Sequence, residues 1–337
     1  MVNIAVIGCG YWGPNYVRIF NELKESKVIC CCDLDKNNLN KMKGLYPFVT
    51  TTEDYKKIAK DPNIDGIVIT TPLNAHYEIA KFCLERKKHV LIEKPFTSNS
   101  KQGEELMQIA KDNNLILMVG HVYEYNSGIR KLKEIMKEKL GKIYYINAER
   151  VGLGPIRKHA NVLWDLATHD ISIALFLLGT LPKEVTAMGG SYIQENIEDL
   201  VFVSLKFPNG VIYNINASWI APEKVRKTTV IGSKGMAVFD DVNKSEMLKV
   251  YEREIDKNSL NSTPKYTDHQ SIVIMGDIYI PKIEHSEPLK NLTKHFLECI
   301  TENKTPLTDA QDGLNVIRVL EAAEESLKNN GKVVRCQ

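Results

Sequence analysis

The first third of the chain alternates short, continuously apolar runs with longer amphipathic ones. The apolar runs are NIAVIG, KVICCCD, DGIVITT, KHVLIEKP and NLILMVG, and helical patterns begin near residues 12, 36, 74 and 100. Strands that are apolar without alternation are typical of parallel sheets, because helices cover both faces of such a sheet. The pattern predicts a doubly wound parallel α/β domain over residues 1–122.

The pattern changes after about residue 121. A helical segment over residues 127–139 precedes runs that alternate or carry turn signals, such as KIYYINAERV, EDLVFVSLKF, GVIYNINASWI and KTTVIGSKGMAVF. Alternation predicts an antiparallel sheet with one wetter face. We therefore expect an α+β domain over residues 123–287, built on a large, mostly antiparallel, open sheet. Two helices are predicted in residues 288–337, and residues 256–271 are predicted to be a mobile loop.

Length and charge narrow the classes of function. A chain of 337 residues fits two domains, and 44 basic against 42 acidic residues give a net charge of +2. This balance offers no electrostatic basis for binding nucleic acid or an anionic membrane. The apolar runs are shorter than the roughly 20 residues of a membrane-spanning helix. The start of the sequence lacks the pattern of a secretory signal, so we expect a cytoplasmic protein.

The cysteines indicate neither a disulfide framework nor a zinc site. There are seven, and none forms a C-x-x-C pair. We interpret them as ordinary small apolar residues, with Cys30, Cys31 and Cys32 filling a strand. No metal site is predicted.

The strongest motif is VIGCGYWGPN, which lies between the first strand and the first helix. Gly8, Gly10 and Gly13 have the G-x-G-x-x-G spacing, which permits a tight turn and close approach to a dinucleotide pyrophosphate at the helix N-terminus. Tyr11 and Trp12, within the same loop, are further candidate cofactor contacts. The alternative is a glycine turn with no ligand.

Asp33 decides between these two interpretations. It ends the second strand 20 residues after Gly13, where a carboxylate hydrogen-bonds the ribose diol of NAD and would repel the 2′-phosphate of NADP. Strand, helix and Asp33 together predict a Rossmann domain that binds NAD rather than NADP.

The segment HVLIEKPF ends the fifth strand with Glu93 and Lys94. Ligands of parallel sheets bind at the carboxyl ends of the strands, so both residues are candidate cofactor contacts. Pro95 restricts Lys94 to an extended backbone. Taken alone, the segment is more typical of an exposed ion pair at a strand end.

The segment ITTPLNAHYEIA follows the fourth strand in the same way. Thr71, Pro72 and His76 are therefore also candidate cofactor contacts. Asn74 is interpreted as a possible cap of the next helix.

A third motif, WDLATHDIS, lies in an otherwise apolar helical run. Asp165 and His169 are four residues apart and share one helix face. A carboxylate fixes the tautomer of an imidazole and stabilises its protonated form, which a general base requires. A hydrogen-bonded pair within the core explains the spacing equally well. Asp170 lies off this face, so we expect it to make a structural hydrogen bond.

The segment GLGPIRKHAN, just before this helix, offers candidate substrate contacts. The guanidinium of Arg157 suits a carboxylate or a diphosphate, and Asn161 lies close to it in sequence. Tyr123 and His121, which follow the last strand of the first domain, are expected to border the same cleft. A solvated basic loop is the alternative interpretation.

Together these motifs resemble the Gfo/Idh/MocA family, named after glucose-fructose oxidoreductase and inositol dehydrogenase. The resemblance rests on G-x-G-x-x-G, T-P-x-x-x-H, E-K-P and D-x-x-x-H in this order along the chain. It implies a Rossmann domain, a second domain whose open sheet forms a homodimer or homotetramer, and C-terminal helices that return to the Rossmann domain. The active-site trio of the family maps onto Lys94, Asp165 and His169.

Two segments, GYWGPN and LWDLATHDIS, further resemble the branch that acts on nucleotide-linked sugars, including UDP-N-acetylglucosaminuronate 3-dehydrogenases. The resemblance implies an enzyme that transfers a hydride between a sugar hydroxyl carbon, such as the 3-position of a UDP-N-acetyl-hexosaminuronate, and NAD. In this reaction His169 is the base, Lys94 and His169 contact the substrate, and Asp165 orients His169; the assignment of Lys94 as the base stays open. The alternatives are a dehydrogenase of free cyclic polyols or sugars and a non-catalytic NAD-binding regulator.

Overall fold

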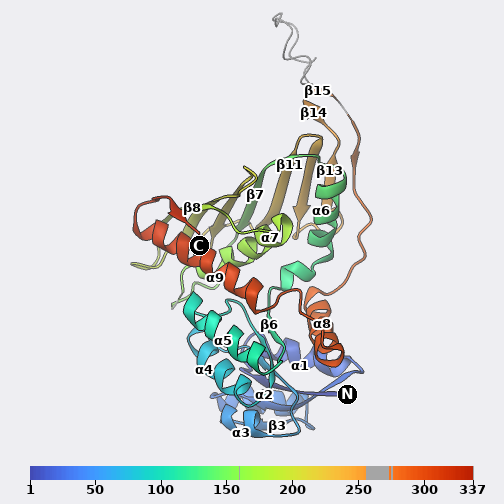
Figure 1. The fold of residues 1–337 in the computed structure, drawn as a ribbon, viewed down its shortest axis with the longest axis vertical. Helices are drawn as coiled ribbons and strands as arrows, with labels where there is room; N and C mark the ends of the chain where they lie inside the picture. Colours follow the sequence, from blue (N-terminus) through green and yellow to red (C-terminus); the bar gives the residue numbers. More distant parts are fainter. Residues whose placement is uncertain (159, 256–272, 275, 337) are drawn as a thin grey trace, which may run out of the picture. The chain divides into compact units, whose positions relative to one another are not determined.

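The chain forms two compact units, each built around its own β-sheet (Figure 1). The computed structural model describes residues 1–158, 160–255, 273–274 and 276–336. The first unit comprises Met1–Tyr125 and Ser286–Glu321, and the second comprises Asn126–His285 and Ala322–Gln337. The predicted mobile loop, residues 256–271, lies outside the described residues.

The sheet of the first unit has six parallel strands in the order β3-β2-β1-β4-β5-β6. The strands are β1 (Val2–Ile7), β2 (Ser26–Cys32), β3 (Thr50–Thr52), β4 (Gly66–Ile69), β5 (His89–Ile92) and β6 (Leu117–Val119). The winding direction reverses between β1 and β4, which is where ligands bind in open parallel sheets. The predicted doubly wound parallel sheet is confirmed.

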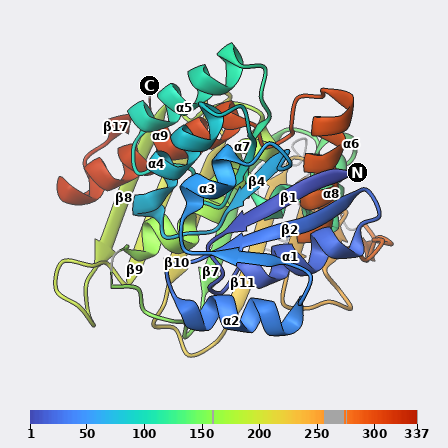
Figure 2. The ribbon, with the colours of Figure 1, turned by 90° about the horizontal axis from the view of Figure 1, so that it is seen from below.

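Helices cover both faces of this sheet. They are α1 (Gly13–Glu22), α2 (Lys36–Leu45), α3 (Tyr55–Lys60), α4 (Leu73–Leu84), α5 (Ser100–Asp112), the 3-10 helix η1 (Val122–Tyr125) and α8 (Pro288–Glu302). Figure 2 shows α1 and α2 on one face and α4 and α5 on the other. Phe296 of α8 packs edge-on against Phe20 of α1, with ring centroids 6.5 Å apart. Pro72 occupies the cap position of α4, so the interpretation of Asn74 as its cap is wrong.

The sheet of the second unit has nine strands in the order β16-β13-β12-β11-β7-β10-β9-β8-β17. They are β7 (Ile143–Val151), β8 (Glu184–Gly190), β9 (Leu200–Lys206), β10 (Ile212–Ser218), β11 (Val225–Gly232), β12 (Gly235–Asp240), β13 (Leu248–Tyr251), β16 (Ile278–Tyr279) and β17 (Val334–Arg335). A separate ribbon pairs β14 (Glu254–Ile255) with β15 (Val273–Ile274). Strands β7 and β10 are parallel and the other pairs in the described sheet are antiparallel, which confirms the mostly antiparallel sheet.

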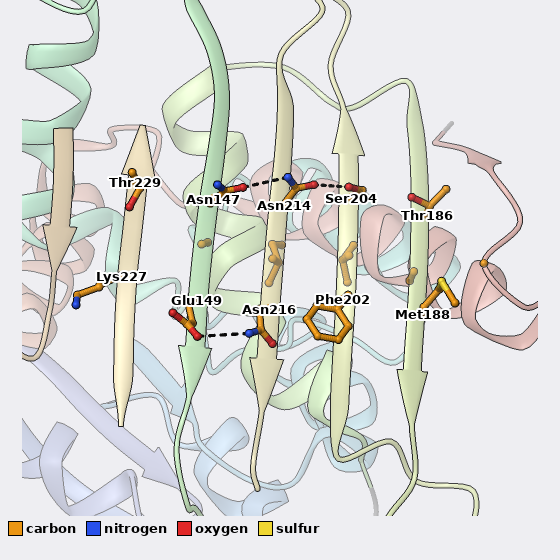
Figure 3. A pocket seen from close by; sticks show the side chains of 15 residues that line it. Asn147, Glu149, Thr186, Met188, Phe202, Ser204, Asn214, Asn216, Lys227 and Thr229 are labelled. Atoms are coloured by element: carbon orange, nitrogen blue, oxygen red, sulfur yellow. Dashed lines mark hydrogen bonds between the residues drawn. The ribbon is translucent and has the colours of Figure 1, made fainter. Parts of the chain in front are cut away.

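Helices α6 (Ser127–Glu138) and α7 (Thr168–Leu178) cover one face of this sheet. Along β10, Tyr213 and Ile215 are buried, whereas Asn214 and Asn216 alternate with them on the opposite face. This opposite face is the predicted wetter one. It forms a broad hollow of about 830 Å³, lined by amide and hydroxyl side chains together with Phe202 and Met188 (Figure 3).

The C-terminal segment divides between the two units. Helix α9 (Ala310–Lys328) begins in the first unit and ends in the second, where β17 pairs with β8. Residues 286–321 thus belong to the unit with the parallel sheet, and residues 322–337 belong to the second unit. No helix in the described part of the chain combines the length and hydrophobicity needed to cross a membrane.

Candidate active site

Two of the three loop glycines are required by the backbone itself. Gly8 has φ +97°, and a Cβ there would lie 2.7 Å from the carbonyl carbon of Thr70. A Cβ on Gly13 would lie 2.1 Å from the carbonyl oxygen of Gly8. The Thr70 hydroxyl also donates to the Gly8 carbonyl at 2.5 Å, so the loop between β1 and α1 is fixed against the end of β4.

Gly10 has a different environment from the other two glycines. A Cβ at this position would meet nothing within 4 Å among the described residues. The adjacent α1 begins with Gly13, and its cap residue Trp12 supplies no side-chain hydrogen bond within the described structure. Tyr11 is 83% exposed and Trp12 is 37% exposed in the same loop. Open space beside amides at a helix N-terminus fits a dinucleotide pyrophosphate.

Asp33 lies directly after β2 and connects that strand to the glycine loop. Its Oδ2 accepts from the backbone N–H of Cys9 at 2.6 Å and from the amide of Asn38 at 3.3 Å. Its Oδ1 accepts from the N–H of Asp35 at 2.8 Å. These bonds orient the carboxylate beside the loop, where a ribose diol would be recognised.

Glu93 is directed into the interior of the first unit. It is 8% exposed, and its Oε1 accepts from the hydroxyl of Tyr16 on α1 at 2.6 Å. Its Oε2 accepts from the backbone N–H of Lys94 at 3.1 Å. Burial raises the pKa of the Glu93 carboxyl, against the lowering effect of Tyr16. The residue therefore links α1 to the backbone of Lys94, and its predicted contact with the cofactor stays a prediction.

Lys94 itself is half-buried at the end of β5, and a histidine from α4 supports the turn that follows it. One ring nitrogen of His76, Nδ1, lies 2.9 Å from the carbonyl oxygen of Pro95, and the other, Nε2, lies 2.8 Å from that of Thr71. Burial lowers the pKa of the imidazole, although both carbonyls favour its protonation. The ring is 1% exposed, so it connects the β4 and β5 turns from within.

Of the other candidates after β4, Thr71 is half-buried and Pro72 is exposed. The hydroxyl of Thr71 is buried and has no hydrogen-bond partner in the described part of the chain. A buried hydroxyl of this kind requires a partner, and a bound cofactor would supply one.

His121, just after β6, lies in a buried charged cluster. Its Nδ1 is 2.8 Å from a carboxylate oxygen of Asp312 in α9 and 3.7 Å from one of Glu124. Burial acts to lower the pKa of His121, but the two carboxylates outweigh it and raise the pKa to about 9. The three ligand-type atoms lie within 4.8 Å of one another. An imidazolium paired with carboxylates accounts for this arrangement without a metal.

In the second unit, Asp165 and His169 do not lie on one regular α-helix. Leu163–Ala167 forms a π-helical turn that leads into α7 at Thr168. Just before the turn, the Oδ1 of Asn161 accepts a hydrogen bond from the backbone N–H of Trp164 at 3.2 Å. Turns of this kind occur frequently at functional sites. The prediction of a continuous α-helix is therefore wrong here, although both side chains remain half-buried at its start.

Two donors reach the same oxygen of Asp165. The indole Nε1–H of Trp219 donates to Oδ2 at 3.2 Å, and the guanidinium Nε of Arg157 lies 3.6 Å from it. Trp219 is 2% exposed, whereas the Arg157 side chain is 52% exposed. The carboxylate is thus held by one rigid and one solvent-exposed group.

The remaining substrate candidates differ in how much their side chains are already engaged. Asn161 accepts from the N–H of Trp164 and donates to Glu198 at 2.7 Å, which joins the loop before α7 to the loop before β9. Tyr123 is half-buried in η1 of the first unit. Lys94 and Tyr123 belong to the first unit, and Arg157, Asn161, Asp165 and His169 belong to the second.

Asp170 makes the structural contact expected from the sequence. It is 1% exposed and receives two hydrogen bonds from Arg150 of β7. The motif analysis missed Arg150, Tyr16, Asp312 and Trp219. The sequence signal for Tyr16 was a tyrosine on the apolar face of α1, because a buried hydroxyl needs a partner. Asp312 lies 191 residues from His121, so no local pattern could pair them.

Comparison with known proteins gives matches to both units. Residues 2–121 match the family model for the NAD-binding Rossmann fold of the Gfo/Idh/MocA oxidoreductases, and residues 133–334 match that for their C-terminal alpha/beta domain. The myo-inositol 2-dehydrogenase of Thermotoga maritima is 23% identical over 98% of this chain and 98% of its own length.

Two solved structures share the fold. A UDP-N-acetylglucosamine 3-dehydrogenase from Acidithiobacillus ferrooxidans superposes with a TM-score of 0.83, 21% identity and 97% coverage of each chain. An oxidoreductase from Agrobacterium radiobacter, solved with NAD⁺, L-tartaric acid and magnesium, gives a TM-score of 0.83 at 17% identity, covering 99% of this chain and 98% of that one.

Proposed function

Because this chain belongs to the Gfo/Idh/MocA family of oxidoreductases with an NAD-binding Rossmann fold, we propose that it oxidises a hydroxyl group of a sugar with NAD. The observation that carries the proposal is the pair of donors that hold the Asp165 carboxylate four residues before His169. A protein that only binds a dinucleotide has no need of an oriented carboxylate four residues before a histidine.

The residues of the first unit fit NAD. The glycine loop with Gly10 and the N-terminus of α1 would hold the pyrophosphate, and the buried hydroxyl of Thr71 would gain a partner. Asp33 would bind the ribose diol. We propose NAD over NADP, because a 2′-phosphate would meet the Asp33 carboxylate beside the glycine loop.

The reaction requires the hydroxyl carbon to lose a hydride and the hydroxyl oxygen to lose a proton. NAD, when bound, accepts the hydride. We assign the proton to Nε2 or Nδ1 of His169, a step that a positioned base accelerates by about 10²- to 10⁴-fold. Lys94 donates a hydrogen bond to the reacting oxygen and stabilises its developing negative charge. Asp165 orients the imidazole and stabilises it once it is protonated.

The substrate we favour is a nucleotide-linked sugar with an anionic group, such as a UDP-N-acetyl-hexosaminuronate oxidised at its 3-hydroxyl. Arg157 supports this choice, because its exposed guanidinium next to Asp165 is suited to a carboxylate or diphosphate. One structural relative is named for a UDP-sugar and another relative for myo-inositol. A free cyclic polyol is therefore the second candidate.

We further propose that the open sheet face pairs with a second copy to form a homodimer or homotetramer. Exposed Phe202 and Met188 flank a row of bonded polar side chains, in which Asn214 donates to Asn147 at 3.0 Å and Asn216 donates to Glu149 at 3.4 Å (Figure 3). Large exposed apolar side chains beside polar groups are typical of protein interfaces. The buried positions of Cys9, Cys31, Cys32, Cys83 and Cys299 as thiols fit a reducing, cytoplasmic location.

One experiment separates these possibilities. The purified protein is incubated with NAD and a panel of UDP-sugars, UDP-sugar uronates, free sugars and inositols, and NADH is followed by its absorbance. We expect turnover with an anionic UDP-sugar. Turnover with inositols alone would identify a free cyclic polyol as the substrate in place of a nucleotide-linked sugar. NAD binding without turnover of any compound would support a regulator instead.

A further inference from the structure

Trp219 occupies a fixed position directly after β10. It is 2% exposed, and its backbone N–H donates to the carbonyl of Asp199 at 3.0 Å. An indole N–H can only donate, and when buried it requires an acceptor. Here the acceptor is the Oδ2 of Asp165 at 3.2 Å. The backbone of Trp219 is thus bonded to that of Asp199, and its indole is bonded to a proposed active-site carboxylate.

The same ring lies against the loop that carries Arg157. A Cβ on Gly154 would approach the Cδ1 of Trp219 at 4.0 Å, which is van der Waals contact. Arg157 follows three residues later and reaches the same Oδ2 at 3.6 Å from an exposed position. An exposed guanidinium exchanges partners readily, whereas a buried indole does not.

We propose that Trp219 is a positioning residue, whose indole N–H holds the Asp165 carboxylate in place when Arg157 turns to an anionic group of the substrate. This inference rests on the proposed function. It explains how one arginine serves both substrate and carboxylate: Asp165 keeps one fixed donor throughout. A hydrogen bond to a charged group of this kind corresponds to a change of about tenfold or more when it is lost.

The hydrogen bond is tested first, without any substrate. The protein has three tryptophans, so a ¹⁵N-indole spectrum gives three N–H signals that Trp12→Phe and Trp164→Phe assign by elimination. We expect Asp165→Ala to shift the Trp219 signal and to accelerate its exchange with solvent. Arg157→Ala is the matched control, because it removes another group close to Oδ2 and leaves the indole bond. A Trp219 signal unaffected by Asp165→Ala would overturn the proposal.

Kinetics then test the consequence. We expect Trp219→Phe to lower kcat about tenfold with an unchanged KM for NAD, and 3-benzothienylalanine at position 219, which replaces the N–H by sulfur in the same shape, to have the same effect. Trp164→Phe removes a buried indole from the same turn and controls for lost packing. In an Asp165→Ala background, Trp219→Phe should lower kcat no further. In an Arg157→Ala background, it should lower kcat by a larger factor than it does in the wild type.

The outcomes separate the two proposals. If Asp165→Ala leaves turnover unchanged, the assignment of Asp165 in the proposed function fails, and the indole spectrum still decides whether Trp219 holds the carboxylate. If Asp165→Ala lowers turnover while Trp219→Phe stays within twofold of the wild type, the positioning role is wrong. Losses that multiply in the double variant would show a packing role instead.

Discussion

The guanidinium of Arg150 and the carboxylate of Asp170 form a bidentate ion pair inside the second unit. The Nε donates to Oδ2 at 2.6 Å and an Nη2 donates to Oδ1 at 3.1 Å, and both side chains are almost fully buried. Removal of one partner leaves a buried charge without its counterion. We expect Asp170→Asn to lower the free energy of unfolding by about 3 kcal/mol, measured by urea denaturation.

The double variant Arg150→Met with Asp170→Leu is the control for that loss. It replaces the pair with apolar side chains, which is frequently neutral for stability. Recovery of most of the lost stability would show that the cost came from an unpaired charge. A double variant as unstable as the single one would indicate that the pair also shapes the packing.

The His121 cluster predicts a pH-dependent stability. Its pKa is raised to about 9 in the folded protein, so the native state holds this proton more tightly than the unfolded chain does. The stabilisation is complete below about pH 6.5, the value for an unfolded histidine, and is lost as the pH rises through about 9, a total on the order of 3 kcal/mol. Thermal unfolding between pH 6 and 10 measures it, and His121→Gln should be nearly insensitive across this window. Parallel curves for both proteins would contradict the assignment.

Replacement of the proposed catalytic groups should abolish turnover and spare cofactor binding. We expect Lys94→Ala and His169→Ala each to lower kcat by at least about 10²-fold, with NADH affinity, followed by its fluorescence, unchanged. Lys101→Ala, an exposed lysine of α5, is the control. Near-normal turnover of either variant with the true substrate would remove that residue from the mechanism.

Asp33 should determine the choice of dinucleotide. Asp33→Ala removes the carboxylate that would repel a 2′-phosphate, so the ratio of kcat/KM for NAD to that for NADP should fall at least about tenfold. Asp35→Ala, which removes the cap of α2 two residues away, should leave the ratio unchanged. An Asp33→Ala ratio equal to that of the wild type would assign the selectivity to other residues.

The open sheet face makes a prediction about assembly. Phe202→Lys together with Met188→Lys introduces like charges into the proposed interface, so we expect monomers by analytical ultracentrifugation where the wild type is a dimer or tetramer. Phe48→Lys, an equally exposed aromatic side chain of the first unit, is the control. A monomeric wild type would refute the proposed assembly.

The elements that were predicted correctly are those whose pattern is local. The unbroken apolar runs of β1, β4 and β5 indicated a parallel sheet, and the glycine spacing located the loop after β1, where Gly8 and Gly13 allow no Cβ. The short β3 and α3 were missed, because three-residue strands and six-residue helices carry too little periodicity.

The contacts that could not be predicted join distant parts of the chain. In the sequence, Trp219 is an ordinary residue at the end of a predicted strand. Its indole N–H reaches Asp165, 54 residues earlier, only in the folded chain. The pairing of His121 with Asp312 and that of Tyr16 with Glu93 depend on tertiary structure in the same way. The residue types predicted the chemistry of Asp165, but its hydrogen-bond donors could be identified only from the three-dimensional structure.

The π-helical turn at Leu163–Ala167 shifts the phase of the helix in which it lies. Each residue of an α-helix advances the chain by about 100°, so one extra residue in a turn rotates everything beyond it relative to what comes before. Asp165 and Asp170 would point about 140° apart on a regular α-helix, and the wider turn changes this angle to one at which Asp165 meets Trp219 and Asp170 meets Arg150. Deletion of a single residue from the turn would change the angle between Asp165 and Asp170, and we expect at least one of the two carboxylates to lose its partner.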